Sequence, residues 1–177
     1  YSAPPNASGL RTFGRKMAYF NGHEPDQSCS LYVTDGTTDD FTYGELGVAS
    51  YTFEMGDDFF QDCATFTSTI LPTNLQALLY AIRVARLPYR LPAGPDALSV
   101  ATTPAGNVTA GTDVLVTATI NDTRYNNTNG TEPVQAIAAA EVYVDTPPWA
   151  AGAAAIALTA ADGTFNATVE AVRGTLS

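Results

Sequence analysis

The chain has 177 residues, of which 45% are hydrophobic, and its formal net charge is −10 with Lys16 as the sole lysine. So acidic a chain is a poor partner for nucleic acid or an anionic membrane, because both attract basic patches. No apolar run approaches the roughly 18 residues of a membrane span. The length suits one ordinary domain or two small ones, and a start at Tyr rather than Met suggests a processed chain.

The first half of the chain predicts two helices. A helix is expected over residues 8–20, capped by Ser8, because its apolar residues recur every three or four positions. A second helix is expected over 73–86, where Thr73 and Gln76 have the spacing of a capping box. Pro88 should end it, since proline cannot continue a helix.

Between these helices, residues 31–55 predict two strands around a polar excursion. A short strand is expected over 31–34, then an acidic turn, a helical turn over 41–46 and a buried strand over 48–55. Glu54 lies in that last apolar run, where a carboxylate is costly to bury unless it is partnered or used. It is therefore either a general base or the partner of a nearby arginine.

Two cysteines, Cys29 and Cys63, flank this stretch at a spacing that fits no zinc signature. A disulfide between them would close a loop of about 35 residues and stabilise the fold by about 3–4 kcal/mol. Two buried free thiols are the alternative. The disulfide is the preferred prediction, because the sequons described below favour an oxidising compartment.

The last third changes in character after a proline-rich linker at 91–97. Beyond it, alternating apolar residues predict short strands separated by turns, including an Asp162-Gly163 hairpin turn. Regular short strands favour an all-β, Ig-like sandwich over residues 98–177. Because about 80 residues is short for seven strands, the sandwich is expected to be incomplete. The strands are expected at 114–120, 141–145, 154–159 and 164–172.

Asparagine occurs unusually often in Asn-x-Ser/Thr triplets, which accept N-linked glycans in secreted proteins. We expect a glycosylated, extracellular surface, with coincidental triplets on a Thr/Asn-rich surface as the alternative. The six asparagines are Asn6, Asn107, Asn121, Asn126, Asn129 and Asn166.

The central stretch, LYVTDGTTDDFTYGELGVASYTFEM, resembles the C-terminal signature of zinc metallocarboxypeptidases of the carboxypeptidase A/B type, in their secreted bacterial branch. Tyr32 and Glu54 stand 22 residues apart, which equals the family's spacing between a substrate-binding tyrosine and the catalytic glutamate. This resemblance covers residues 8–90. It implies that residues 1–90 are the C-terminal portion of a carboxypeptidase-like α/β domain. The tail, with AEVYVDTPPW at 140–149 and DGTF at 162–165, resembles the β-sandwich modules that follow such domains.

The resemblance implies roles for three residues. Glu54 matches the general base, which in the family activates a zinc-bound water against the C-terminal peptide bond and returns its proton to the leaving amine. Tyr32 matches the mobile tyrosine that closes over the C-terminal residue of a peptide or protein substrate. Asp39 falls at the floor of the side-chain pocket, where it would favour C-terminal Lys or Arg. A solvated acid of the loop is the alternative for Asp39.

The family's zinc ligands have no counterpart here. They form a His-x-x-Glu pair with a later histidine, whereas His23 is the sole histidine of this chain. Catalytic zinc needs three protein ligands, so zinc is expected only in the full enzyme and this chain alone should be inactive. The alternative is a glycosylated extracellular structural or filament subunit, built from such a protein, that self-associates through an edge strand of the sandwich.

Overall fold

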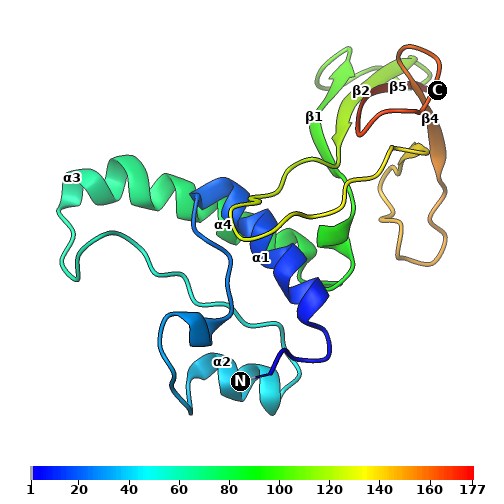
Figure 1. Ribbon diagram of the computed structural model, residues 1–177. Coiled ribbons are helices and arrows are strands. Elements are labelled where there is room, and N and C mark those ends of the chain that lie inside the picture. The colour runs from blue at the N-terminus through cyan, green and yellow to red at the C-terminus, as the bar shows by residue number, and fades with distance from the viewer. Residues whose placement is uncertain (1) are drawn as a thin grey trace. The chain divides into compact units, whose positions relative to one another are not determined.

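A computed structural model describes residues 2–177 and divides the chain into two compact units. One unit, here called the helical unit, contains the residues up to 94 together with 125–132. The other, the sheet unit, contains 95–124 and 133–177. Figure 1 shows helices and extended segments in the first unit and strands in the second. The fold is thus mixed α/β with a curled antiparallel sheet.

The first helix, α1 (Ala7–Asn21), confirms the helix expected over 8–20. It begins after Asn6, so Ser8 lies inside the helix instead of capping it. Gly22 ends the helix in the left-handed conformation, with φ of 73°, and its amide donates to the carbonyl of Ala18 at 2.9 Å. Glycine suits this position because it has no Cβ to clash there.

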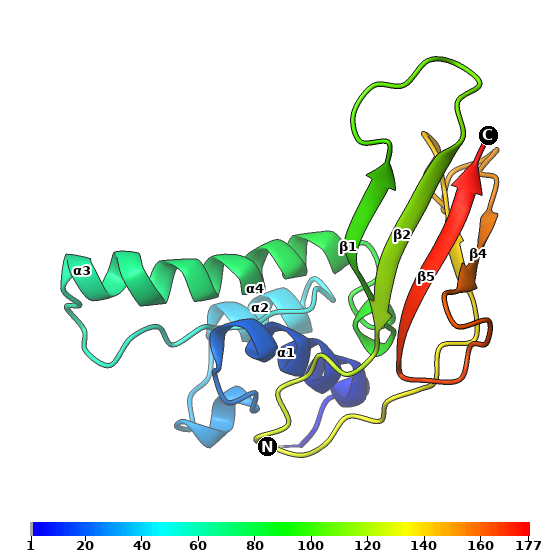
Figure 2. The same cartoon turned by 90° about the horizontal axis from the view of Figure 1, so that it is seen from above.

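The second helix begins ten residues earlier than expected. It runs without a break through α3 (Cys63–Thr65), a π-helical turn (Phe66–Ile70) and α4 (Leu71–Val84), as Figure 2 shows. Asp62 caps it by accepting from the amide of Thr65 at 2.9 Å. The Thr73 capping box is wrong, because its hydroxyl lies within the helix and donates to the carbonyl of Thr69 at 2.8 Å. The wide π turn stands just before Pro72, where a regular helix would clash with the proline ring.

The core of the helical unit lies between α1 and α4. Phe13 and Met17 of α1 pack against Ala77, Tyr80 and Val84 of α4, and all five are buried. The apolar periodicity of α1 therefore identifies its buried face, whereas most of the leucine-rich face of α4 is exposed and its buried face is the one with Ala77 and Tyr80.

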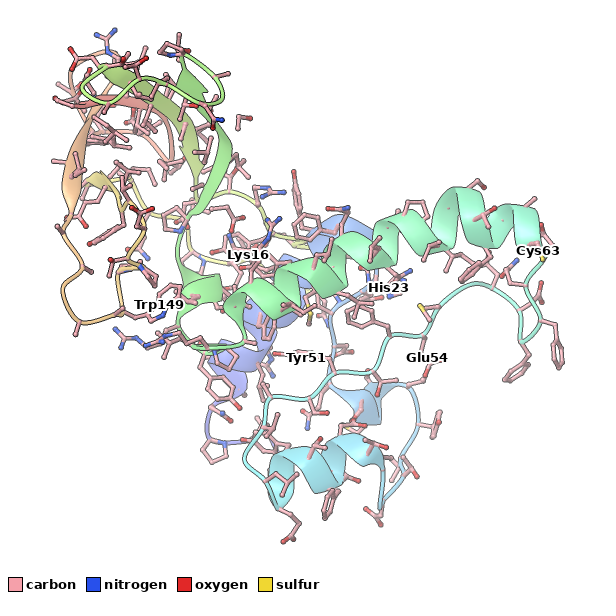
Figure 3. The ribbon with its side chains drawn as sticks, turned by 180° about the vertical axis from the view of Figure 1, so that it is seen from behind. Lys16, His23, Tyr51, Glu54, Cys63 and Trp149 are labelled. Atoms are coloured by element: carbon pink, nitrogen blue, oxygen red, sulfur yellow. The ribbon has the colours of Figure 1, made fainter. Side chains whose placement is uncertain are left out.

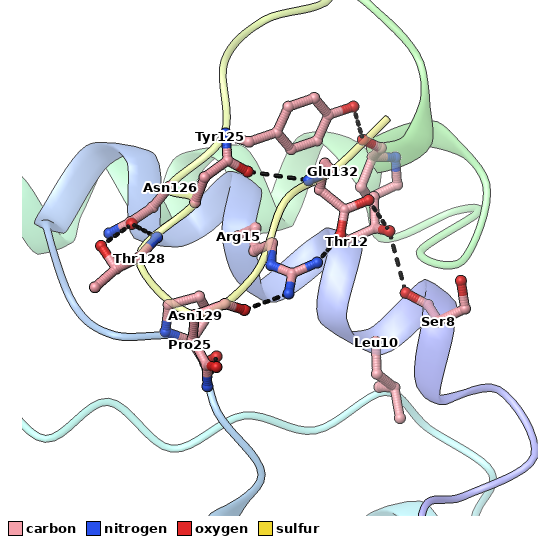
Figure 4. Close-up of polar contacts among 12 residues, drawn as sticks. Ser8, Leu10, Thr12, Arg15, Pro25, Tyr125, Asn126, Thr128, Asn129 and Glu132 are labelled. Atoms are coloured by element: carbon pink, nitrogen blue, oxygen red, sulfur yellow. Dashed lines mark hydrogen bonds and ion pairs between the residues drawn. The ribbon is translucent and has the colours of Figure 1, made fainter. Parts of the chain in front are cut away.

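Residues 125–132 complete the helical unit on the polar side of α1. The Lys16 ammonium lies 4.4 Å from the centre of the Tyr125 ring, and Lys16 is fully buried. Glu132 accepts from the Thr12 hydroxyl at 2.8 Å and forms an ion pair with Arg15 (Figure 4). A buried charge needs such partners, so this distant segment makes the burial of Lys16 and Arg15 possible.

The two strands expected in the central stretch do not form. Residues 31–34 follow a short 3-10 helix (Ser28–Ser30) and are exposed, and residues 48–55 are extended but unpaired. Between them α2 (Thr38–Gly44) begins three residues before the expected helical turn. An extended segment becomes a strand only when another strand pairs with it, and the described residues offer none here.

The sheet unit is a five-stranded antiparallel sheet in the order β1-β2-β5-β4-β3, and Figure 2 labels the first four strands of this order. After a 3-10 turn (Leu91–Ala93), the long strands β1, β2 and β5 pair side by side, and β4 links them to the short β3. Ala140, Leu158 and Val172 form its buried core. The strands are β1 (Asp96–Thr103), β2 (Val114–Asn121), β3 (Ala140–Val142), β4 (Ile156–Ala160) and β5 (Val169–Leu176).

Two buried carboxylates hold the loops of this sheet unit. Asp122 accepts from the amide of Gln135 at 2.6 Å. Glu170 accepts from the amides of Asn166 and Ala167 at 2.8 and 2.7 Å. Main-chain donors therefore bind both acids and lower the cost of burying them, although the second oxygen of Asp122, Oδ1, accepts no hydrogen bond in the described structure.

The structure does not confirm a second, facing sheet of an Ig-like sandwich among residues 95–177. The tight Asp162-Gly163 hairpin turn is also not formed as expected. Ala160 pairs with Val172, so a longer loop that contains Asp162 and Gly163 joins β4 to β5. The edge strand β1 was not predicted as such, because its polar residues break the apolar alternation. Its register with β2 shifts between Leu98 and Ala101.

Both cysteines are free, so the predicted Cys29–Cys63 disulfide is wrong for this structure. Cys63 is exposed at the start of α3 (Figure 3), and Cys29 lies in the 3-10 helix at 28–30. Loop-closure entropy says how much a bond would stabilise the fold, and not whether its two ends meet. Across residues 2–177 no helix has the length and apolarity to cross a membrane.

Candidate active site

The segment 51–55 presents two different sides, because successive side chains of an extended chain point in opposite directions. Tyr51, Phe53 and Met55 line an apolar hollow of about 350 Å³ beside α4. Thr52 and Glu54 belong to the other side. The alternation of aromatic and polar residues that suggested a strand thus also places Glu54 away from the apolar hollow (Figure 3).

Tyr51 anchors this segment to the core, a role that the sequence did not reveal. Its ring meets that of Phe13 edge-on at 4.9 Å between centres, and its hydroxyl donates to the carbonyl of Leu10 at 2.9 Å. Burial, and then the neighbouring Tyr89, raise the pKa of the Tyr51 phenol far above its usual range. Tyr51 therefore stays neutral and fixes the position of the chain three residues before Glu54.

Asp39 lies in the first turn of α2 and reaches the polar side of the extended segment. Its carboxylate accepts from the Thr52 hydroxyl at 3.3 Å. Thr37 and Asp40 cap the helix reciprocally: the Thr37 side chain accepts from the Asp40 amide, and the Asp40 side chain accepts from the Thr37 amide. A capped helix thus holds the Asp39 carboxylate against Thr52, which lies two residues before Glu54 in the segment. Thr52 is a further positioning residue, and no motif in the sequence singles it out.

Tyr32 and Glu54 are both exposed, and no hydrogen bond joins them within residues 2–177. Tyr32 is 64% exposed in the loop after the 3-10 helix at 28–30. Glu54 accepts no hydrogen bond and forms no ion pair in the described part of the chain, so the alternative of a structural Arg partner gains no support. Of the three candidate residues, Asp39 contacts Thr52 on the side of the extended segment that also carries Glu54. Tyr32 lies in a separate loop.

The residues present do not fit a zinc site. The sole histidine, His23, meets the ring of Phe53 edge-on at 6.0 Å, and burial lowers the pKa of its imidazole. Within residues 2–177, no three His, Cys, Asp or Glu side chains are grouped so that they could hold a metal ion. Catalytic zinc takes three such ligands, so any zinc that works with Glu54 needs ligands from outside these residues.

The six sequon asparagines differ in how their side chains are used. The Asn126 amide nitrogen, the atom that carries an N-linked glycan, donates to the carbonyl of His23 at 2.9 Å and that of Ala18 at 3.4 Å. Asn129 donates to Pro25 at 3.3 Å, whereas Asn107 is exposed. Modification of Asn126 would break contacts that hold residues 125–132 in the helical unit. Asn6, Asn121 and Asn166 lie before α1, at the end of β2 and in the loop before β5.

No family model matches the chain. A stretch of 49 residues is 51% identical to a protein from Saccharothrix mutabilis subsp. capreolus. That protein is named a zinc carboxypeptidase. The match covers 28% of this chain and 11% of the Saccharothrix carboxypeptidase, so the chain spans only a small fraction of its relative. The similarity supports carboxypeptidase ancestry for a small part of this chain.

Proposed function

We propose that residues 1–90 supply the C-terminal part of a zinc carboxypeptidase catalytic domain, which removes C-terminal amino acids from peptides. The 51% identity to a zinc carboxypeptidase carries this proposal. Glu54 supports it, because an exposed carboxylate on a well-anchored segment can accept a proton from an attacking water and deliver it to the leaving amine.

The neighbouring residues fit supporting roles. Thr52 holds the Asp39 carboxylate on the same side as Glu54, where it would attract a basic C-terminal side chain. Tyr32 lies in an exposed loop, so its ring can move over a bound peptide. Asp39 and Tyr32 thus act on the substrate's last residue, and Glu54 acts on the bond that is cut.

The chain would act only together with a zinc-binding portion that brings the three metal ligands. The metal, when bound there, would polarise the scissile carbonyl and the attacking water. Secretion, the sheet unit as an appended Ig-like module and glycans at the exposed sequons belong to the same proposal. They rest on the sequons and on the resemblance of residues 98–177 to such modules.

The test is Glu54→Gln in a longer polypeptide that binds zinc and cleaves C-terminal residues. We expect kcat to fall by about 100-fold or more with zinc content unchanged, because glutamine keeps the shape but cannot take the proton. Glu45→Gln, an exposed acid at the end of α2, is the matched control and should leave kcat unchanged. Full activity of the Glu54→Gln variant would refute the assignment.

A further inference from the structure

Asp122 lies just after β2 in the sheet unit and has one carboxylate oxygen without a partner. The residue is fully buried, at 0% exposed. Its Oδ2 accepts from the amide of Gln135 at 2.6 Å, whereas Oδ1 accepts no hydrogen bond within residues 2–177. A buried carboxylate oxygen is costly to leave without a partner, so Oδ1 needs a donor or a cation.

A second buried carboxylate, that of Glu170, faces the same side of the sheet. Ile120 of β2 pairs with Glu170 of β5, and the amide of Asp122 continues this register by donating to the carbonyl of Thr168 at 2.9 Å. Because side chains alternate along a strand, Asp122 and Glu170 are diagonal neighbours on one face. Both main-chain hydrogen bonds to Glu170 go to Oε1, which leaves Oε2 for another partner.

The basic side chains of the sheet unit do not compensate these two acids. The unit contains two arginines and neither lysine nor histidine. Arg124 forms an ion pair with Asp96 at 3.2 Å. Arg173 is exposed and lies an odd number of residues from Glu170 along β5, so its side chain points to the opposite face. Two buried like charges on neighbouring strands therefore favour the uptake of a proton or of a cation.

We propose that Asp122 and Glu170 bind a calcium ion through Asp122 Oδ1 and Glu170 Oε2, at the end of the β2–β5 pair. The site lies wholly in the sheet unit and is independent of the proposed catalytic function. Calcium takes about six to eight oxygen ligands, and carbonyls, hydroxyls and water supply many of them, so two carboxylates can be enough. Zinc fits poorly, because it takes three or four His, Cys or acidic ligands, and within residues 2–177 no three such side chains are grouped.

The ion would join three segments that meet at this corner of the sheet unit. The two acids belong to the end of β2 and the start of β5. Residues 133–137 complete the corner, because the Gln135 amide donates to Asp122 and the Ile137 amide donates to the carbonyl of Ala167 at 2.9 Å. Calcium should therefore stabilise the folded sheet unit, since the unfolded chain does not bring these segments together.

The test adds calcium chloride to the full 177-residue chain after treatment with EDTA. Titration calorimetry should show one ion bound per chain. At a calcium concentration of about 100 times the Kd, the ratio of folded to unfolded sheet unit should rise about 100-fold, measured in urea by the fluorescence of Trp149. The transition at 222 nm, which reports the helices, should stay in place. Sodium chloride of equal ionic strength is the control and should not reproduce the effect.

Two variants test the assignment of the ligands. Asp122→Asn and Glu170→Gln should each weaken calcium binding by about tenfold or more, because the amide keeps an oxygen but loses the charge. Asp162→Asn, at an exposed acid in the loop that joins β4 to β5, is the matched control and should leave the affinity unchanged.

Three results would overturn the proposal: no stoichiometric binding to the unaltered chain, unchanged affinity in both ligand variants, or equal stabilisation by sodium chloride. The first of these needs no variant, so a variant that fails to fold does not protect the proposal. A sheet unit that ignores calcium but gains stability as the pH falls from about 7 to about 5 would show that the two acids take up a proton instead, and would also overturn it.

Discussion

The helical and sheet units differ in how completely their own residues pair the main chain and cover the apolar side chains. In the sheet unit, each strand pairs with a neighbour, and buried acids accept from main-chain amides. In the helical unit, the core between α1 and α4 is well packed, yet α4 keeps an apolar face outward and 49–55 remain unpaired. All three candidate catalytic and substrate-binding residues belong to the helical unit. The unit that contains the candidate catalytic and substrate-binding residues is therefore also the one with an exposed apolar helix face and an unpaired extended segment.

The chain contains its own means of measuring the two units separately. Trp149, its single tryptophan, belongs to the sheet unit, whereas all the α-helices belong to the helical unit (Figures 1 and 3). Tryptophan fluorescence therefore reports unfolding of the sheet unit. Circular dichroism at 222 nm reports that of the helical unit.

The largest expected effect is that of Phe13→Ala on the helical unit. Phe13 is 5% exposed and contacts both Tyr51 and Tyr80, so its loss leaves a cavity. We expect the free energy of unfolding measured at 222 nm in urea to fall by about 3–5 kcal/mol. The Trp149 transition should stay in place. Arg11→Ala, an exposed position on the same helix, is the control, and a joint shift of both transitions would show that the units unfold as one.

Glu132→Ala tests whether residues 125–132 stabilise the helical unit. It leaves Arg15 buried without its carboxylate and removes the acceptor of the Thr12 hydroxyl. We expect a loss of about 3 kcal/mol, measured by circular dichroism. Glu132→Gln keeps an acceptor but loses the charge, so its loss should be smaller. An effect seen only in Trp149 fluorescence would contradict this prediction, because it would show that residues 125–132 stabilise the sheet unit instead.

Val172→Ala is the counterpart of Phe13→Ala in the sheet unit. Val172 is 2% exposed and belongs to the core of that unit. Its truncation should lower the free energy of unfolding by about 2 kcal/mol. The change should be seen by Trp149 fluorescence and not at 222 nm. Val169→Ala, at an exposed position of the same strand, should change little.

The smallest expected effect concerns pH and His23. Burial lowers the pKa of His23 in the folded helical unit below its ordinary value of 6.5, so the unfolded chain binds a proton more readily. The helical unit should therefore lose stability as pH falls below about 6.5, and regain it as pH rises. Urea midpoints between about pH 5 and pH 7.5 measure this slope. His23→Gln should reduce it, and an unchanged slope would assign it to other groups.

Much of the helical unit could be predicted because its cause is local. The apolar rows of α1 and α4 and the glycine after Asn21 gave these helices directly. The start of the second helix was missed, because a π turn carries the helix across Pro72 and places Thr73 inside it. The strand predicted at 48–55 does not form, because pairing depends on a partner that the local sequence cannot specify.

The candidate site was predictable as a set of residues and not as an arrangement. The 22-residue spacing between Tyr32 and Glu54 relates these two residues through the resemblance to the family. The hydrogen bond from Thr52 to Asp39 and the anchoring of Tyr51 depend on how α2 and α1 meet the extended segment. Contacts between distant elements, such as Glu132 with Arg15, leave no periodic signal in the sequence.

The discontinuity of the helical unit has a consequence for synthesis. The chain passes between the two units after residues 94, 124 and 132. During translation, α1 and the long helix, which ends at Val84, are complete 48 residues before Glu132 is added. Until Tyr125 and Glu132 have been synthesised, Lys16 and Arg15 cannot make their contacts with these two residues. Maturation of the helical unit therefore depends on β1 and β2 having been made first, although neither strand belongs to it.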